Sequence, residues 1–177
     1  MGERVVLGVD PGSKATGWCV IKGTSVLAVG IIKIRDTLPA AEILRRLLPP
    51  LEIVVSKWKP DLTVVEGQQF KYGGKAAPED IIKLANVAGG IAGQIMAFCS
   101  TKMIIPFPSD WKGQTPKEIS QSRTYQHFGI MSSMGTSYSY PSGCKVACAI
   151  AGYAATNRGD WKEIGDAMGL ARYGAEL

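Results

Sequence analysis

The stretch Val5–Ser13, VVLGVDPGS, contains the strongest fold signal in the sequence. A β-branched and apolar strand is expected over Arg4–Asp10, and it ends in a carboxylate followed by a Pro-Gly turn. Two further strand-like segments, Gly17–Lys22 and Thr24–Lys33, follow after short turns that contain glycine. Because short connections favour antiparallel pairing, we expect these three strands to form a meander.

The rest of the chain alternates between helical and strand-like segments. Pro39–Lys59 carries apolar residues at roughly helical spacing, although Pro49-Pro50 should kink this segment or divide it in two. Leu62–Glu66 follows as a short buried strand, and a right-handed crossover would make it parallel to an earlier strand. The remaining expected elements are a helix over Pro78–Cys99, a strand over Lys102–Phe107, a helix with Thr115 as its N-cap and its end near Gly129, a mobile loop over Met131–Gly143, an apolar helix over Cys144–Asn157 and a last helix from about Trp161 to Tyr173. The sequence therefore predicts one α/β domain over residues 1–177, with a mixed five-stranded sheet flanked by helices.

Composition narrows the classes of partner. The 20 Lys and Arg residues exceed the 15 Asp and Glu residues, which gives a net charge of +5 and favours anionic partners. The longest apolar stretches, such as Val5–Val9 and Ile104–Pro108, are shorter than the roughly 18 residues that a membrane helix needs. No signal-peptide pattern follows Met1, so we expect a cytoplasmic protein with no membrane partner. The 4 cysteines form no CxxC pair and the single histidine is remote from them, which favours free thiols over a zinc site.

Carboxylates stand where the predicted strands end. Asp10 closes the first strand and Glu66 closes the fourth, so the two would lie within a few ångströms if these strands are neighbours. Such a pair repels unless a cation or a proton intervenes. Glu163 and Asp166 share one face of the last helix, and small residues around Asp166 allow that helix to approach the sheet. Oxygen ligands without His or Cys suit Mg²⁺ or Mn²⁺, and a pair of such ions roughly 4 Å apart can support phosphodiester cleavage. The alternative is that the strand-end acids only cap loops and that Glu163 is solvated.

These motifs resemble the RuvC family of Holliday junction resolvases, in the ribonuclease H-like superfamily. The resemblance rests on VVLGVDPGS with Gly17-Trp18, then Val64-Val65-Glu66, then Gly165–Ala171 (GDAMGLA), in the family's order over nearly the whole chain. Trp111–Lys117 (WKGQTPK) is similar to a stretch of phage-type members. The resemblance implies a ribonuclease H-like fold and a homodimer that binds a four-way DNA junction. It further implies one metal-dependent nick in each of two opposing strands, leaving 5′-phosphates, with the two-fold symmetry of the dimer matching that of the junction.

The resemblance also implies roles for individual residues. Asp10, Glu66 and Asp166 match the three acids of the family, and Glu163 matches the fourth, where members usually have Asp or His. These acids would hold two Mg²⁺ ions, for which Mn²⁺ would substitute. Phe70 resembles the aromatic residue that stacks on junction bases, although it lies one residue later than usual and Tyr72 is a rival; Phe70 could instead fill a dimer core. The candidates for contact with DNA phosphates are Lys71, Lys75, Lys112, Lys117 and Arg123, each of which could also be a solvated charge.

Three other functions compete with this one. The Asp10–Ser13 turn also resembles the phosphate loop of sugar kinases and actin-like ATPases, but those proteins need two such halves and 177 residues hold one. A related ribonuclease H-like nuclease could act on RNA or on branched or flap DNA. A non-catalytic DNA-binding relative should have lost an acid, and this sequence has not. For a resolvase we expect the cytoplasm of a bacterium, or of a host if the protein is phage-encoded.

Overall fold

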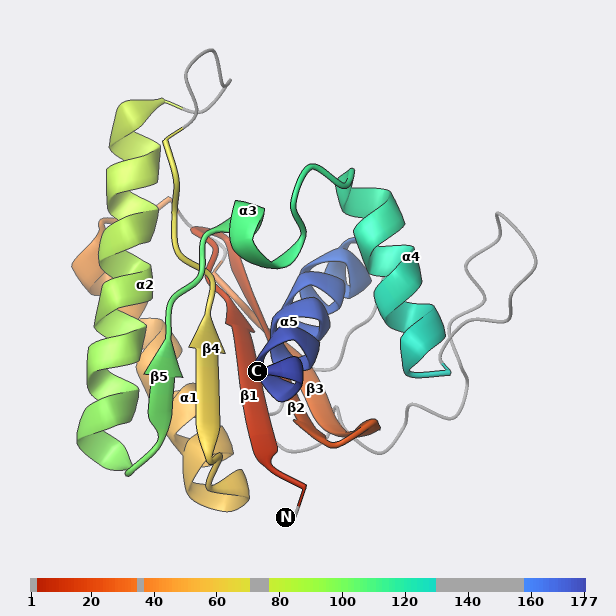
Figure 1. Ribbon diagram of the computed structural model, residues 1–177. Coiled ribbons are helices and arrows are strands. Elements are labelled where there is room, and N and C mark those ends of the chain that lie inside the picture. The colour runs from red at the N-terminus through yellow and green to blue at the C-terminus, as the bar shows by residue number, and fades with distance from the viewer. Residues whose placement is uncertain (1–2, 35–36, 71–76, 130–157) are drawn as a thin grey trace.

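The computed structural model describes residues 3–34, 37–70, 77–129 and 158–177. Its five strands form one mixed sheet in the order β3-β2-β1-β4-β5 (Figure 1). The strands are β1 (Val5–Asp10), β2 (Ala15–Lys22), β3 (Ser25–Lys33), β4 (Leu62–Val65) and β5 (Lys102–Ile104). The first three pair antiparallel, β4 is parallel to β1, and β5 is parallel to β4. The predicted meander, parallel crossover and mixed five-stranded sheet are therefore confirmed.

The helices lie on the two faces of this sheet. They are α1 (Ala40–Trp58), α2 (Pro78–Phe98), α3 (Pro108–Trp111), α4 (Lys117–His127) and α5 (Arg158–Glu176). Helix α5 packs on β1 and β2, and α4 packs on α5. Helices α1 and α2 pack on each other and lie on the other side of the sheet (Figure 1). The last helix is longer at both ends than the predicted Trp161–Tyr173.

Two glycines let the backbone of α5 lie directly on the sheet. A Cβ atom at Gly8 in β1 would overlap the carbonyl oxygen of Ala167, and one at Gly17 in β2 would overlap the carbonyl oxygen of Glu163. Gly17 stands opposite Asp10 in the antiparallel register of β1 and β2. This close approach places the first half of α5 beside the end of β1, where the first predicted acid stands.

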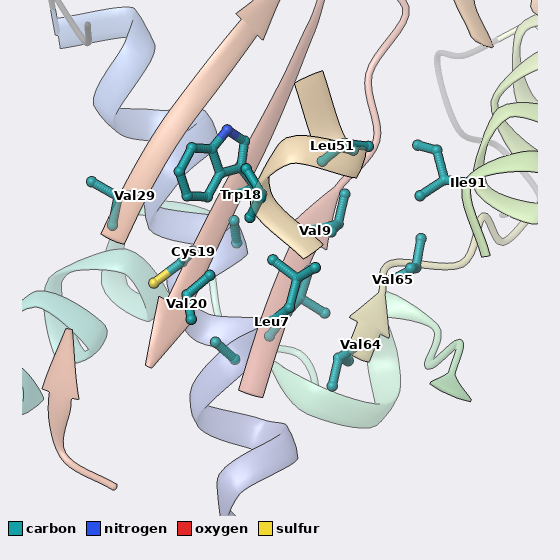
Figure 2. Close-up of a cluster of buried hydrophobic side chains, with 14 of the residues drawn as sticks. Leu7, Val9, Trp18, Cys19, Val20, Val29, Leu51, Val64, Val65 and Ile91 are labelled. Carbon is teal, nitrogen blue, oxygen red and sulfur yellow. The ribbon is translucent and has the colours of Figure 1, made fainter. Parts of the chain in front are cut away.

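The core on the opposite face fixes which side chains of β1 and β4 point away from α5. Leu7, Val9 and Val65 are fully buried there, together with Leu51 of α1 and Ile91 of α2 (Figure 2). Burying an aliphatic side chain of this size contributes about 1.5–3 kcal/mol to stability. Because side chains alternate along a strand, the positions next to Leu7 and Val9 face α5, and Asp10 is among them. The same alternation that builds the core thus turns the strand-end carboxylate toward α5.

Three details differ from the predicted elements. Helix α1 continues through Pro49 and Pro50, so of the two expected outcomes, a kink or a division of the segment, the division is excluded; the buried residues Leu47 and Leu51 on either side hold the helix against the core. Strand β5 ends at Ile104 and not at Phe107, since Pro106 has no N–H for a ladder and its carbonyl accepts a hydrogen bond from the Gly67 amide, 2.8 Å.

The start of α4 also differs from its prediction. Its N-cap is Pro116 and not Thr115, because the Thr115 amide donates to the Lys112 carbonyl, 3.1 Å, and closes a turn before the helix begins. The preceding short helix α3 was not predicted. The expected loop Met131–Gly143 and helix Cys144–Asn157 lie outside the described residues.

Helix α2 changes one expectation drawn from composition. Its most apolar 18 residues have a mean hydropathy of 1.4, so by length and composition alone it could cross a membrane. Core helices meet the same criterion, and α2 packs on α1 in this structure. The criterion therefore does not by itself assign α2 to a membrane.

Candidate functional site

Two of the predicted acids meet at one edge of the sheet. Asp10 is the last residue of β1, and Glu66 directly follows β4, whose residue Val65 stands opposite Val9 in the parallel register. The ladder continues past the strand, because the Glu66 amide donates to the Val9 carbonyl, 2.9 Å. Both side chains are buried, with 6% of Asp10 and 8% of Glu66 exposed. The register thus brings together two carboxylates that are 56 residues apart in the sequence.

Helix α5 adds the other two acids. Asp166 is only 2% exposed, while Glu163, one turn earlier, is half-buried. Burial, and then the negative charges of Glu66, Asp166 and Glu163, raise the pKa of Asp10 well above its usual range. A carboxyl group responds in this way when like charges crowd a site from which water is largely excluded. The four acids predicted from the sequence therefore form one electrostatically linked cluster.

Two lysines lie on this cluster. Lys117 Nζ, at the start of α4, is 2.6 Å from Asp166 Oδ2, and Lys112 Nζ, just after α3, is 3.2 Å from Glu66 Oε1. Burial lowers the pKa of Lys117, but the carboxylates of Asp166, Glu163 and Asp10 outweigh that effect and raise it. Both lysines were predicted from the sequence as candidates for contact with DNA phosphates. In this structure, both instead neutralise carboxylates.

Two further residues of the site were missed from the sequence. Gln121 Nε2 donates to Asp166 Oδ1, 3.0 Å, and to the Lys162 carbonyl, 2.6 Å, which ties α4 to α5. Trp111 Nε1 donates to Glu66 Oε1, 3.2 Å. Both had a signal: Gln121 is four residues after Lys117 and so shares its face of α4, and Trp111 belongs to the WKG stretch.

The donor set suits a hard divalent cation. It consists of carboxylate oxygens only, the ligands that Mg²⁺ and Mn²⁺ prefer, and it carries an excess of buried negative charge. Over the described ranges, no group of three or more His, Cys, Asp or Glu side chains is arranged to hold a metal ion as it stands. Lys117 and Lys112 each occupy an oxygen that such an ion would use. The residues fit the metal in kind and charge, and the lysines are what a metal would displace.

Two further residues that were predicted to contact DNA, Phe70 and Arg123, belong to the described part of the chain. Phe70, four residues after Glu66, is 60% exposed. Arg123 is exposed on α4, six residues after Lys117. Lys71, Tyr72 and Lys75 lie outside the described residues, so their places in the site stay predictions.

Comparison with known proteins gives one family. The family model described as crossover junction endodeoxyribonuclease RuvC matches residues 6–105, more than half of the chain. A curated protein of that name from Chlorobium chlorochromatii (strain CaD3) is 31% identical over 98 residues, which cover 53% of this chain and 49% of the relative. The one from Helicobacter pylori (strain P12) is 30% identical over 95 residues, covering 51% and 57%. The chain thus matches about half the length of these curated relatives.

Solved structures share the fold over nearly the whole chain. Thermus thermophilus RuvC, in complex with a Holliday junction substrate, has a TM-score of 0.65 at 18% identity, over 96% of this chain and 91% of that one. The yeast mitochondrial Holliday junction resolvase Ydc2 has a TM-score of 0.61 at 13% identity, over 96% and 77%. The fold is the ribonuclease H-like fold of these resolvases. The matched range 6–105 contains Asp10 and Glu66, and with it the chain belongs to the RuvC family of crossover junction endodeoxyribonucleases.

Proposed function

We propose that this chain is a nuclease that resolves four-way DNA junctions, with residues 1–177 acting as one nuclease domain. The observation that carries the proposal is the cluster of the buried acids Asp10, Glu66 and Asp166 with the half-buried Glu163, contributed by β1, the end of β4 and α5. Membership in the RuvC family supports DNA junctions as the substrate. Such an enzyme would work in the cytoplasm of a bacterium, or of a host cell if a phage encodes it.

The proposed reaction is hydrolysis of one phosphodiester bond in each of two opposing strands. The oxygen of a water molecule attacks phosphorus, the bond to the 3′-oxygen breaks, and that oxygen takes up a proton, which leaves a 3′-hydroxyl and a 5′-phosphate. The four acids would hold two Mg²⁺ ions, or Mn²⁺ in their place. When bound, these cations would ease deprotonation of the attacking water and stabilise charge on the leaving oxygen.

The two lysines would change partners during this reaction. With the carboxylates engaged by metal, Lys117 and Lys112 are free to turn to the phosphate that lies against the same acids. Gln121 would meanwhile keep hold of Asp166 Oδ1, so that this carboxylate stays oriented when Lys117 leaves its other oxygen. The two lysines that stabilise the acids in this structure would thus stabilise the substrate phosphate instead.

The exposed face of α2 supports a homodimer. Ile82 is 61% exposed and Met96 is 53% exposed, and a Cβ atom at Gly89 or Gly93 would meet nothing within 4 Å. These four positions, spaced by seven, four and three residues, follow one stripe of the helix. A second copy of the chain can approach closely along such a stripe, and a two-fold axis there would present two sites to a two-fold symmetric junction.

Phe70 is proposed as the residue that stacks on an unpaired base at the crossover. Its exposed ring follows Glu66 by four residues, so a base resting on it would lie close to the cutting site. Stacking of a base on an aromatic ring is worth about 1–3 kcal/mol. Such a contact would favour DNA whose strands open at the crossover over continuous duplex.

The experiment that tests the proposal compares three labelled substrates of matched sequence in Mg²⁺: a four-way junction, a flap and an RNA–DNA hybrid. We expect paired nicks at symmetric positions on the junction alone, and DNA ligase should reseal them if they carry 5′-phosphates. Cleavage of the hybrid or the flap with no cleavage of the junction would instead support a related nuclease of different substrate class.

A further inference from the structure

A cleft of about 210 Å³ opens beside the acid cluster, between α3, α4 and α5. Lys112 stands at its boundary, since it lines the cleft while its Nζ atom lies 3.2 Å from Glu66 Oε1. Trp111 also stands at this boundary, since it lines the cleft while its indole N–H donates to Glu66. The cleft therefore begins where the proposed cutting site ends, and one molecule can lie across both.

The lining of this cleft is strongly basic. Arg123 of α4 and Arg172 of α5 join Lys112, against the single carboxylate Glu176. Arg123 makes no ion pair with any residue that the structure describes, whereas Arg172 Nε lies 2.7 Å from Glu176 Oε1. Because Lys112 is paired with Glu66 and Arg172 with Glu176, Arg123 leaves one uncompensated positive charge in the cleft, which requires an anionic ligand or solvent.

The other lining groups suit a sugar-phosphate chain. Thr115 and Ser120 present hydroxyl groups, which can donate hydrogen bonds to phosphate oxygens, and Tyr173 presents an aromatic surface. Guanidinium, hydroxyl and aromatic groups that together line an open cleft are suited to contact with a nucleic-acid backbone.

We propose that this cleft holds the sugar-phosphate backbone of the DNA strand next to the phosphate that is cleaved, with Arg123 and Arg172 on its phosphate oxygens. The proposal rests on the proposed nuclease function and adds the path that the strand takes away from the acids. Glu176 has a defined part in it: it competes with the phosphate for Arg172, so it weakens binding. Removal of Arg172 and removal of its partner should therefore have opposite effects.

The test measures binding of a labelled four-way junction in EDTA, so that the DNA stays intact, over a range of salt concentrations. Arg123→Gln and Arg172→Gln should each weaken binding roughly tenfold and reduce the slope of log K against log salt by about one. Glu176→Gln should instead tighten binding severalfold, and Arg172→Lys should retain most of the affinity that Arg172→Gln loses.

A matched control is available on α1, where Arg45 Nη2 and Glu42 Oε1 form a similar pair at 2.7 Å on the other side of the sheet. Arg45→Gln and Glu42→Gln change the net charge equally and should leave junction affinity within twofold of the parent. If the α1 variants match the cleft variants, general charge explains the result and the cleft proposal is overturned. It is also overturned if Arg172→Gln and Glu176→Gln both bind as the parent does.

Failure of the cleft is distinguishable from failure of the nuclease function. If the parent protein nicks junctions while all cleft variants bind normally, only the cleft proposal is overturned. If the parent protein neither nicks a junction nor prefers it to duplex DNA, the proposed nuclease function, on which the cleft proposal rests, is overturned. Thermal unfolding of each variant checks folding, and Glu176→Gln decides the matter if Arg172→Gln does not fold, since removing Glu176 leaves every proposed phosphate contact in place.

Discussion

Lys117 Nζ lies 2.6 Å from Asp166 Oδ2, on a carboxylate that is only 2% exposed. In the absence of metal, this contact supplies positive charge to a cluster whose members repel one another. A divalent cation would satisfy the same need. Under the proposed function, Lys117 and the metal would therefore compete for Asp166, and the lysine would set how tightly the protein binds metal.

Lys117→Met should separate metal binding from cleavage. Without the competing ammonium group, we expect Mn²⁺ or Mg²⁺ to bind about tenfold more tightly, which adds about 1.4 kcal/mol to the stabilisation at saturating metal. For a chain of this size, that is an additional rise in Tm of about 3–6 °C. Junction cleavage should fall nevertheless, because the proposed phosphate contact is lost.

Thermal unfolding with increasing Mn²⁺ measures the first effect, and Lys83→Met serves as the control. Lys83 Nζ lies 3.1 Å from Asp80 Oδ1 in the first turns of α2, away from the cluster. Its removal should leave the metal-induced shift in Tm unchanged. A smaller shift for Lys117→Met than for the parent would show that Lys117 assists metal binding and would contradict the competition.

The acids of the cluster should differ in their importance for cleavage. Asp10→Asn, Glu66→Gln and Asp166→Asn should abolish nicking and leave junction binding in EDTA largely intact, because they remove proposed metal ligands rather than phosphate contacts. Glu163→Ala should cost less, about 10- to 100-fold, because this side chain is only half-buried at the margin of the cluster. Gel assays of nicking and binding on one labelled junction measure both. Full activity of Glu163→Ala would take that residue out of the site, and loss of binding by a folded Asp10→Asn variant would argue against a ligand role.

Asp10→Asn should also stabilise the metal-free protein. Burial and the neighbouring carboxylates raise the pKa of Asp10 in the folded state, so its ionised form is disfavoured there relative to the unfolded chain. Stability attributable to Asp10 is consequently present at low pH and lost as the pH rises through the raised pKa. Asparagine has no charge to bury, so the variant in EDTA should melt above the parent at pH 7–8, by about 2–4 °C for each kcal/mol of relieved repulsion.

The pH dependence distinguishes this cause from a change in packing. The difference in Tm should shrink as the pH approaches about 4, where Asp10 of the parent is protonated. Asp80→Asn on the exposed start of α2 is the control and should show no such convergence. A constant difference at every pH would mean that charge is not the reason.

The sequence predicted what depends on local pattern and simple topology. Strands were identified from their apolar runs, and the meeting of Asp10 with Glu66 follows once β1 and β4 are parallel neighbours. The partners of these acids were missed because they depend on how α3 and α4 pack. Lys112 and Glu66 are 46 residues apart in sequence, and no local pattern says that a basic residue will neutralise an acid rather than face solvent. The sequence left open whether Pro49 and Pro50 kink or divide α1 for a related reason, since the burial of the flanking leucines, which outweighs the helix-breaking tendency of proline, depends on packing.

Phe70→Ala should slow junction cleavage with little effect on stability. The ring is 60% exposed, so its removal leaves no cavity, while a stacking contact of about 1–3 kcal/mol would be lost from the bound junction. Rates under single-turnover conditions should fall about 5- to 100-fold with Tm within about 1 °C of the parent. Phe107→Ala, at a ring that is 45% exposed, is the control and should retain more activity. A large drop in Tm for Phe70→Ala would assign the ring to packing, for instance against a second subunit.

Met96→Glu should separate the proposed dimer into monomers. Met96 lies on the α2 stripe with Ile82, Gly89 and Gly93, and a carboxylate there would be buried without a partner at a two-fold interface and would face its own copy. Ile53→Glu on α1 is a matched control, because Ile53 is also 53% exposed. Sedimentation at micromolar concentration should give half the parent's mass for Met96→Glu and the parent's mass for Ile53→Glu. Because each proposed site makes one nick, the monomer should still bind metal but should lose paired cleavage. A parent that already sediments as a monomer would contradict the homodimer, and a Met96→Glu variant that stays dimeric would place the interface elsewhere than on α2.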